Sequence, residues 1–183
     1  MPLSFSSASF HNITVSGRAV SGATTLSRLL AKKLGWKLIN GGELVRMYMK
    51  EKGIPLEKTA LTSDKYHLEL DDFITEKLRQ EKNLIIESWL SGFDASGISG
   101  VYKILVICSD EKERIKRIMQ RDGMTQKEAG RHLTTRQEEN LKKWEKLYRT
   151  RDFWNPKFFD LMIDTANKNA QETLNTVLEN ISF

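Results

Sequence analysis

Five short apolar segments alternate along the chain with longer segments that have helical periodicity. The apolar segments are 12–16, 36–40, 83–87, 102–108 and 160–164, and the helical segments are 24–34, 43–52, 64–81, 110–120, 125–148 and 169–181. The centre of each apolar segment is continuously hydrophobic, so we expect strands that are buried on both faces. This alternation predicts an α/β fold, with a five-stranded parallel sheet and helices on both of its faces.

The composition of the 183 residues is that of a globular protein, with 39% hydrophobic and 29% charged residues. The longest strongly apolar run, 104–108, is far too short to span a membrane. The first twelve residues carry neither the basic region of a secretory signal nor the arginines of a transit peptide. Cys108 is the single cysteine, which excludes an internal disulfide. We therefore expect a cytoplasmic protein without a membrane segment.

One segment accounts for the whole net charge of +5. Residues 103–157 contain 15 Lys and Arg against 9 Asp and Glu, whereas the rest of the chain is close to neutral. A local positive excess of this kind suits an anionic partner. Nucleotide phosphates fit this description, and nucleic acid is a second, less favoured partner.

The sequence GRAVSGATT, residues 17–25, has the spacing of a phosphate-binding loop, except that Ala23 replaces the usual lysine. Glycines let such a loop curl until consecutive N–H groups point at phosphate oxygens, and the start of the next helix adds further N–H groups. The residues expected to hold the phosphates of ATP are Gly17, Ser21, Gly22, Ala23, Thr24 and Thr25. Thr24, or alternatively Thr25, can also offer its hydroxyl to Mg²⁺, and Thr24 is the expected residue. The alternative interpretation is a plain glycine turn between a strand and a helix.

The charge missing at Ala23 has candidate replacements in later helices. Arg114, Arg117 and Arg121 are spaced three and four residues apart, on one face of a helix. Further basic residues follow within 125–148. A helical hairpin that closes over a triphosphate would turn these side chains toward it, and phosphoryl transfer requires mainly positioning and charge neutralisation. The alternative is a basic helix surface that faces water.

Several motifs together resemble a known family. They are GELVR after the second strand, ESWLSG after the third, RIMQRDG, TTRQEENLKKWEKLY and FFDLMIDTA. In order and spacing they are similar to the cytidylate kinase-like branch of the nucleoside monophosphate kinases, over about residues 12–180. The resemblance implies a P-loop core with a helical substrate-binding insertion and a helical lid. It also implies transfer of the γ-phosphoryl group of ATP, with Mg²⁺, to a nucleoside monophosphate, with CMP or dCMP as the favoured acceptor.

The family layout, placed on this chain, predicts one domain over residues 1–183. The core would comprise 12–41, 83–120 and 156–183, the substrate-binding insertion about 42–82, and the lid about 121–155. We expect this domain to act as a monomer on a small-molecule substrate.

The resemblance also implies roles for individual basic residues. Arg46, in GELVR, matches the arginine that binds the acceptor phosphate. Arg117 and Arg121 match the pair that bridges donor and acceptor, and Arg136 matches a second lid arginine. Together with Thr24 these three arginines are the expected catalytic residues. Lys143 falls where relatives often have arginine, and is expected to bind substrate.

Three further residues are candidates for substrate binding. Asp71 lies in the helix that flanks the monophosphate, although a surface carboxylate is an equal alternative. Glu87 ends an apolar strand, where it could order Mg²⁺ through water, accept a hydrogen bond from a substrate hydroxyl, or cap the next loop. Trp89 stands where many relatives have an arginine that holds the acceptor phosphate. An indole can stack on a base, or it can pack beneath the lid.

The two departures from the family, at Ala23 and Trp89, leave three functional hypotheses. The first is a nucleoside monophosphate kinase. The second is a catalytically weakened nucleotide- or RNA-binding protein of the same fold, whose RNA affinity would depend on salt. The third is a kinase of a different small-molecule acceptor.

Overall fold

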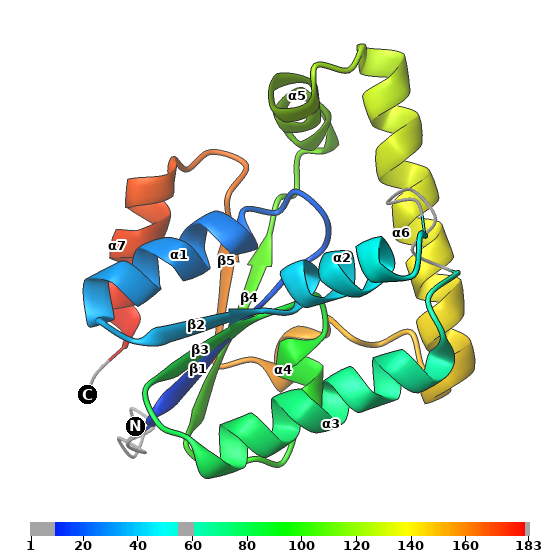
Figure 1. Cartoon of the computed structure of the whole chain (residues 1–183). Helices are drawn as coiled ribbons and strands as arrows, with labels where there is room; N and C mark the ends of the chain where they lie inside the picture. Colours follow the sequence, from blue (N-terminus) through cyan, green and yellow to red (C-terminus); the bar gives the residue numbers. More distant parts are fainter. Residues whose placement is uncertain (1–9, 55–60, 182–183) are drawn as a thin grey trace.

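The computed structural model describes residues 10–54 and 61–181, and Figure 1 shows the arrangement of the whole chain. The strands are β1 (Asn12–Ser16), β2 (Lys37–Asn40), β3 (Leu84–Glu87), β4 (Val101–Ile107) and β5 (Leu161–Asp164). The helices are α1 (Ala23–Leu34), α2 (Gly41–Glu51), α3 (Asp64–Gln80), α4 (Ser91–Asp94), α5 (Glu111–Asp122), α6 (Gln126–Tyr148) and α7 (Ala170–Asn180), with a 3-10 turn η2 (Pro156–Phe158). Each predicted strand and long helix is confirmed to within two residues. The short elements α4 and η2 were not predicted.

The five strands form one parallel sheet in the order β2-β3-β1-β4-β5. β1 is central, and Asn12 pairs with Leu84 of β3 on one side and with Val101 of β4 on the other. The predicted fold class is therefore confirmed. Because all strands run in the same direction, their carboxyl ends lie along a single edge, which is where open α/β sheets bind ligands.

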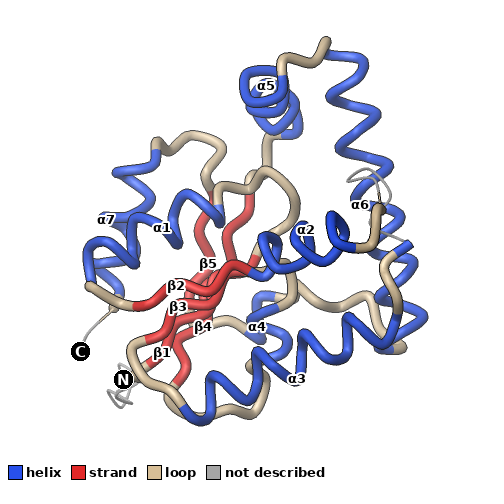
Figure 2. Tube along the Cα trace, in the orientation of Figure 1, coloured by secondary structure: helices blue, strands red, loops and turns tan. Residues whose placement is uncertain are grey.

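Helices cover both faces of the sheet, as Figure 2 shows. α1 and α7 pack on one face, where Leu26 and Val177 join a core that includes Ile85 of β3. α3 covers the opposite face, where Ile74 packs with the other members of β3, among them Ile86. Successive residues of β3 thus face opposite cores, which is why the strand sequence is apolar throughout.

The helices α5 and α6 form a hairpin beyond the carboxyl edge of the sheet (Figure 1). Near the turn of this hairpin, Ile118 and Leu133 pack against Ala19 of the β1–α1 loop. Farther along α6, Leu141 and Trp144 pack against core residues that follow β3. The second half of α6 is therefore built into the core. The division into core, insertion and lid stays a prediction.

In the part of the chain that the structure describes, no helix combines the length and the hydrophobicity that a membrane span requires.

Candidate active site

The loop from Gly17 to Gly22 has the curled backbone of a phosphate cradle. A Cβ atom at Gly17 would collide with Ser21 Oγ and with the carbonyl oxygen of Val106, so only glycine fits at this position. Gly22 caps α1 with a φ of 100°, a conformation that L side chains rarely adopt. No side chain caps α1. The N–H groups of its first turn are therefore left for a ligand, as in other anion sites at helix N-termini.

Side chains from two other segments hold the loop in shape. Arg114 of α5 donates two hydrogen bonds to the carbonyl oxygen of Ala19, at 3.1 and 2.8 Å. Thr165, just after β5, donates to the carbonyl oxygen of Ser21 at 2.7 Å. Arg117 in turn donates to Thr165 Oγ1 at 3.0 Å and to its carbonyl oxygen at 2.8 Å. The loop is thus fixed by buried contacts that reach across the carboxyl edge.

Val20 shows that this shape is imposed on the loop. Its φ is 62°, in the left-handed region that β-branched residues avoid. Such a conformation costs of order 1–3 kcal/mol and persists only where surrounding structure enforces it. Ser21 Oγ is buried and has no hydrogen-bond partner among the described residues. A strained loop with an unpartnered hydroxyl is suited to receive the oxygen atoms of a phosphate group.

Glu87 lies at the centre of the site, at the end of β3. Its carboxylate accepts hydrogen bonds from Thr24 Oγ1 at 3.3 Å and from Asn40 Nδ2 at 2.5 Å. Asn40 also caps α2, because its Oδ1 accepts from the N–H of Glu43 at 2.8 Å. Glu87 therefore joins the start of α1, the start of α2 and the end of β3.

Burial raises the pKa of Glu87 to about 7, although the Thr24 hydrogen bond and the nearby Arg46 charge both lower it. Only 6% of the residue is exposed. The carboxylate is thus close to half protonated near neutral pH, and a cation beside it would favour the charged form.

The residues around Glu87 fit a magnesium ion bound mainly through phosphate oxygens and water. Mg²⁺ in phosphoryl-transfer sites takes one or two carboxylates and keeps several waters. Thr24 and Glu87 offer a hydroxyl and a carboxylate within hydrogen-bonding distance of each other. Among residues 10–54 and 61–181 there is no cluster of three or more His, Cys, Asp or Glu that could hold a metal alone. An ion here would therefore depend on the nucleotide for its other ligands.

Arg46 of α2 and Arg136 of α6 lie near Glu87, and Arg121 of α5 lies near Arg136. The charge of Arg46 acts on both Glu87 and Arg136. Burial, followed by the charges of Arg121 and Arg46, lowers the pKa of Arg136. The Nε atom of Arg136 is buried without a hydrogen-bond partner in the described structure. Arg121 forms a 2.6 Å ion pair with Asp122 at the end of α5. The concentration of positive charge beside α2 and α6 is suited to an anion.

The candidate arginines of α5 do not share one target. Arg114 is directed at the loop backbone and at Gln137 Oε1, which it approaches to 2.5 Å. Arg117 donates hydrogen bonds to Thr165 and, from its Nε at 3.2 Å, to Glu113 Oε1. Their spacing predicted that they would turn together toward a triphosphate, and for Arg114 that expectation is wrong. Its guanidinium stabilises the loop by hydrogen bonds to the carbonyl oxygen of Ala19.

Trp89 is part of an aromatic cluster beneath the α6 helix. Its ring lies 5.3 Å from the ring of Trp144 and 6.3 Å from that of Trp154. The guanidinium of Arg136 lies 5.4 Å from its centre. The indole therefore supports Arg136 and also packs in the core. Whether it contacts a base stays a prediction.

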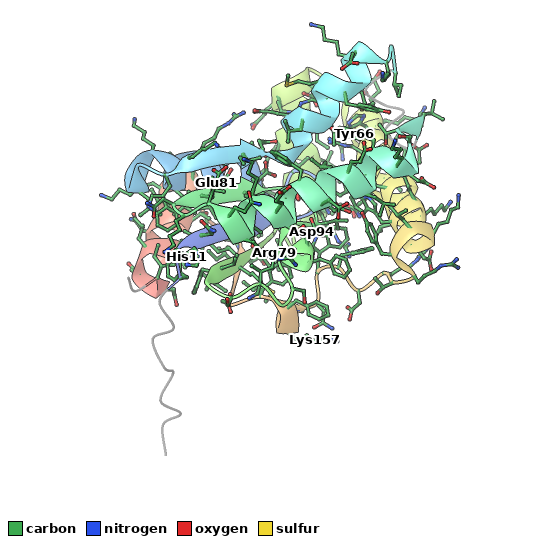
Figure 3. The ribbon with its side chains drawn as sticks, turned by 60° about the horizontal axis from the view of Figure 1, so that its bottom comes forward. His11, Tyr66, Arg79, Glu81, Asp94 and Lys157 are labelled. Carbon is green, nitrogen blue, oxygen red and sulfur yellow. The ribbon has the colours of Figure 1, made fainter. Side chains whose placement is uncertain are left out.

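Asp71 lies away from the loop, in a buried acidic group between α3, α4 and α6. The hydroxyl of Tyr148 donates a hydrogen bond to its carboxylate. Burial raises the pKa of Asp71 to about 6, and burial together with Asp71 raises the pKa of Asp94. Figure 3 views the molecule from the α3 side, with Asp94 labelled beside that helix. The substrate-binding role of Asp71 stays a prediction.

Lys143 connects α6 to the segment before α3. Its Nζ donates to the carbonyl oxygen of Thr62 and, at 3.0 Å, to Thr62 Oγ1. Thr62 Oγ1 also lies 2.7 Å from His67 Nε2, and burial lowers the pKa of His67 to about 4. Only 7% of the Lys143 side chain is exposed. Its contact with substrate stays a prediction. In the structure Lys143 is held by Thr62 where α6 packs beside the start of α3.

Several residues that shape this site were not predicted as site residues, among them Asn40, Asp94, Tyr148, Trp154 and Thr165. Asn40 could have been found, since it stands at a strand end and at the N-cap of the next helix. The others make contacts between distant segments, and single-sequence patterns carry no signal for such pairs.

The topology and the loop together define a protein of the P-loop fold. A solved gluconokinase from Sinorhizobium meliloti has a similar fold, with a TM-score of 0.58 and 15% identity, over 96% of this chain and 93% of that one. At this identity the likeness concerns the fold alone.

The sequence comparisons go further. The model of the cytidylate kinase-like family matches residues 12–167, and the chain belongs to that family. A cytidylate kinase from Thermococcus kodakarensis is 36% identical over 163 residues, which are 85% of this chain and 79% of the relative. A cytidylate kinase from Ignicoccus hospitalis is 30% identical over 168 residues, 90% of this chain and 95% of the relative. The protein is therefore an enzyme of the nucleoside monophosphate kinase type.

Proposed function

We propose that this enzyme transfers the γ-phosphoryl group of ATP, with Mg²⁺, to a pyrimidine nucleoside monophosphate, either CMP or dCMP. The observation that carries the proposal is the position of Glu87, hydrogen-bonded to Thr24 of the donor loop and to Asn40 at the start of α2. One carboxylate thus joins the donor site to the helix that carries Arg46.

The donor half of the site follows from the loop. The backbone of residues 17–22 and the uncapped start of α1 would bind the phosphates of ATP. Thr24 and Glu87 would hold Mg²⁺, directly or through water. When bound, this ion would bridge phosphate oxygens and neutralise the charge that builds up on them.

The acceptor half follows from the arginines beside Glu87. Arg46 and Arg136 approach the same region from α2 and α6, and neither forms an ion pair in the described structure. An acceptor phosphate between them would gain charge-assisted hydrogen bonds. The relatives named cytidylate kinase favour a cytosine base on that phosphate.

The test is an assay of ADP release over the common ribo- and deoxyribonucleoside monophosphates, with and without Mg²⁺. We expect turnover that requires Mg²⁺ and is fastest with CMP or dCMP. The same folded sample is also assayed for ATP binding and for salt-dependent RNA binding.

Two other outcomes would each overturn the proposal. ATP or RNA binding without turnover of any nucleotide would identify the weakened binding protein. Turnover of a sugar or a carboxylic acid, but of no monophosphate, would identify a kinase of another acceptor.

A further inference from the structure

Arg18 is the second residue of the phosphate-binding loop, and it is exposed. Its guanidinium carbon lies 4.8 Å from the centre of the Trp154 ring, a cation–π contact. Among the residues that the structure describes, Arg18 forms no side-chain hydrogen bond or ion pair. Burial and, to a lesser extent, the charge of Arg18 lower the pKa of Arg114. The hydrogen-bond donors of Arg18 are therefore available to a ligand, and they lie in the loop that lacks the usual lysine.

Trp154 is a fixed support for this arginine. Its Nε1 donates a 2.8 Å hydrogen bond to the carbonyl oxygen of Trp89. Its ring packs edge-on against Phe153, which is completely buried. Because the indole is held both at its nitrogen and at its ring, the direction of Arg18 is set before any ligand arrives. A pre-positioned guanidinium loses little entropy on binding.

The neighbouring indole holds a second arginine in the same way. Arg136 lies over Trp89, and the rings of Trp89 and Trp154 are 6.3 Å apart. One guanidinium comes from the donor loop and the other from α6. Neither forms an ion pair among residues 10–54 and 61–181. An anion that reached both would gain charge-assisted hydrogen bonds from each guanidinium.

The remaining arginines close to the loop are engaged elsewhere. Arg114 is hydrogen-bonded to the Ala19 carbonyl oxygen and to Gln137. Arg117 is hydrogen-bonded to Thr165. In this arrangement neither offers its guanidinium freely to the donor, whereas Arg18 does.

We propose that Arg18, held by Trp154, binds the outer phosphates of the donor nucleotide and replaces the side-chain charge that Ala23 lacks. The proposal rests on the proposed kinase function. In the transfer, an acceptor phosphate oxygen forms a bond to the γ-phosphorus as the bond from that phosphorus to the β–γ bridging oxygen breaks. The electron pair of the broken bond stays on ADP. Arg18 neutralises the negative charge that develops there.

The first experiment compares Arg18→Gln and Arg18→Lys with Arg79→Gln. Arg79 is an exposed arginine on α3, labelled in Figure 3, at the end of that helix that leads into β3. For Arg18→Gln we expect the KM for ATP to rise about 10- to 100-fold, and kcat to fall by a similar factor. Arg18→Lys should retain part of both, and Arg79→Gln should match the unmodified protein. Equal KM and kcat for Arg18→Gln and Arg79→Gln would overturn the proposal.

The second experiment places the charge back in the loop. Ala23→Lys is introduced alone and together with Arg18→Gln. If Arg18 does the work of the absent lysine, Ala23→Lys should recover at least tenfold of kcat/KM in the Arg18→Gln background, by the usual effect of one charged donor. The same substitution should bring little gain to the unmodified protein. An equal gain in both backgrounds would show that the two positions act independently, against the proposal.

The third experiment separates support by Trp154 from its packing role. Trp154→Leu keeps apolar bulk and removes the aromatic face. We expect the KM for ATP to rise several-fold with Arg18 present and to stay unchanged in the Arg18→Gln background. If Trp154→Leu raised the KM for ATP equally with Arg18 and with Arg18→Gln, Trp154 would act through packing only. This result would overturn its assigned role in holding Arg18.

Binding of inorganic tripolyphosphate, measured by calorimetry, distinguishes failure of this proposal from failure of the kinase function. This probe needs neither a base nor an acceptor. We expect Arg18→Gln to weaken its binding about tenfold or more, even if no monophosphate is turned over. Unchanged tripolyphosphate affinity in a protein that phosphorylates CMP would overturn the role of Arg18 and leave the kinase function standing.

Discussion

The hydroxyl of Tyr148, at the end of α6, donates a hydrogen bond to the carboxylate of Asp71 on α3. Lys143, one turn earlier, is bonded to Thr62 just before α3. The two residues of each contact are far apart along the chain, by 77 positions for Tyr148 and Asp71 and by 81 for Lys143 and Thr62. The two contacts therefore join the predicted lid to the predicted insertion. Any closing motion therefore either moves α3 with α6 or bends α6 before Lys143.

The buried acidic group gives the first prediction, which concerns stability. The pKa of Asp71 is about 6 in the folded protein against 3.8 ordinarily, so the folded state binds more protons between these values. Stability should therefore fall as the pH rises through that window, and the cost is complete above pH 6.

Asp71→Asn should remove this cost, because its amide oxygen still accepts from Tyr148. Above pH 6 we expect a gain of order 1–3 kcal/mol in the free energy of unfolding. Urea denaturation at pH 4.5 and at pH 8 measures it. Asp72→Asn, at the exposed neighbouring position, is the comparison. The charge of Asp72 contributes less than burial to the raised pKa of Asp71, so this variant should show only a smaller gain. An equal gain in both variants would rule out burial of Asp71 as the cause.

The second prediction concerns Glu87 and magnesium. Since the pKa of Glu87 is raised to about 7, activity at limiting Mg²⁺ should rise between about pH 6 and pH 8 as the carboxylate ionises. Glu87→Gln should lower kcat about 100-fold or more and abolish this rise, by loss of the charge that faces the metal. Initial rates over a Mg²⁺ and pH grid measure both effects.

The same substitution makes a separate test by denaturation. The pKa of Glu87 is about 7 in the folded protein against 4.5 ordinarily, so stability should fall as the pH rises from about 4.5 to about 7, and the cost is complete above pH 7. Glu87→Gln should therefore be at least as stable as the unmodified protein at pH 8. A less stable variant at pH 8 would contradict the destabilising effect of the buried carboxylate, and the absence of a cooperative unfolding transition would attribute the loss of activity to unfolding.

The third prediction assigns Arg46 to the acceptor. Arg46→Ala should raise the KM for the monophosphate about 10- to 100-fold, the usual effect of losing a charged hydrogen bond, and should leave ATP affinity within about twofold. Lys50→Ala, at an exposed position later in α2, is the matched control. If the KM for ATP rose as much as the KM for the monophosphate, the assignment of Arg46 to the acceptor would be wrong.

The fourth prediction compares two glycines. A Cβ at Gly17 collides with backbone, whereas a Cβ at Gly130 in α6 has only Ile115 Cδ1, at 3.7 Å. Gly17→Ala should destabilise the protein by about 1–3 kcal/mol, as in overpacked cores, and should abolish ATP binding. Gly130→Ala should stabilise α6 by about 0.5–1 kcal/mol. Thermal unfolding and ATP titration test both; normal ATP binding by Gly17→Ala would contradict the cradle geometry.

The fold followed from the sequence because its signals are local. β3 is apolar on both faces, and Thr125 and Glu128 form the capping box that begins α6, so each element could be predicted from its own residues. The four residues of α4 are too few for a periodic pattern. This short helix nevertheless places Asp94 beside Asp71.

The site could be predicted only in part, for a related reason. The loop and Glu87 stand at strand ends, and the parallel topology brings such ends together. The partners of the arginines depend on tertiary packing. Arg114 is hydrogen-bonded to the Ala19 carbonyl oxygen, and Arg18 lies over the Trp154 ring. The spacing of the basic residues predicted a replacement charge in distant helices, whereas the structure has an arginine available in the loop itself.

Three of the four tryptophans, Trp89, Trp144 and Trp154, lie in the cluster that carries Arg18 and Arg136. The fourth, Trp36, lies just before β2 and packs against Phe10. Most of the intrinsic fluorescence of the protein therefore originates beside the site, and emission should respond when nucleotide binds there. The intrinsic tryptophan fluorescence of the enzyme can therefore be used to rank ligands by affinity in titrations that need no added label.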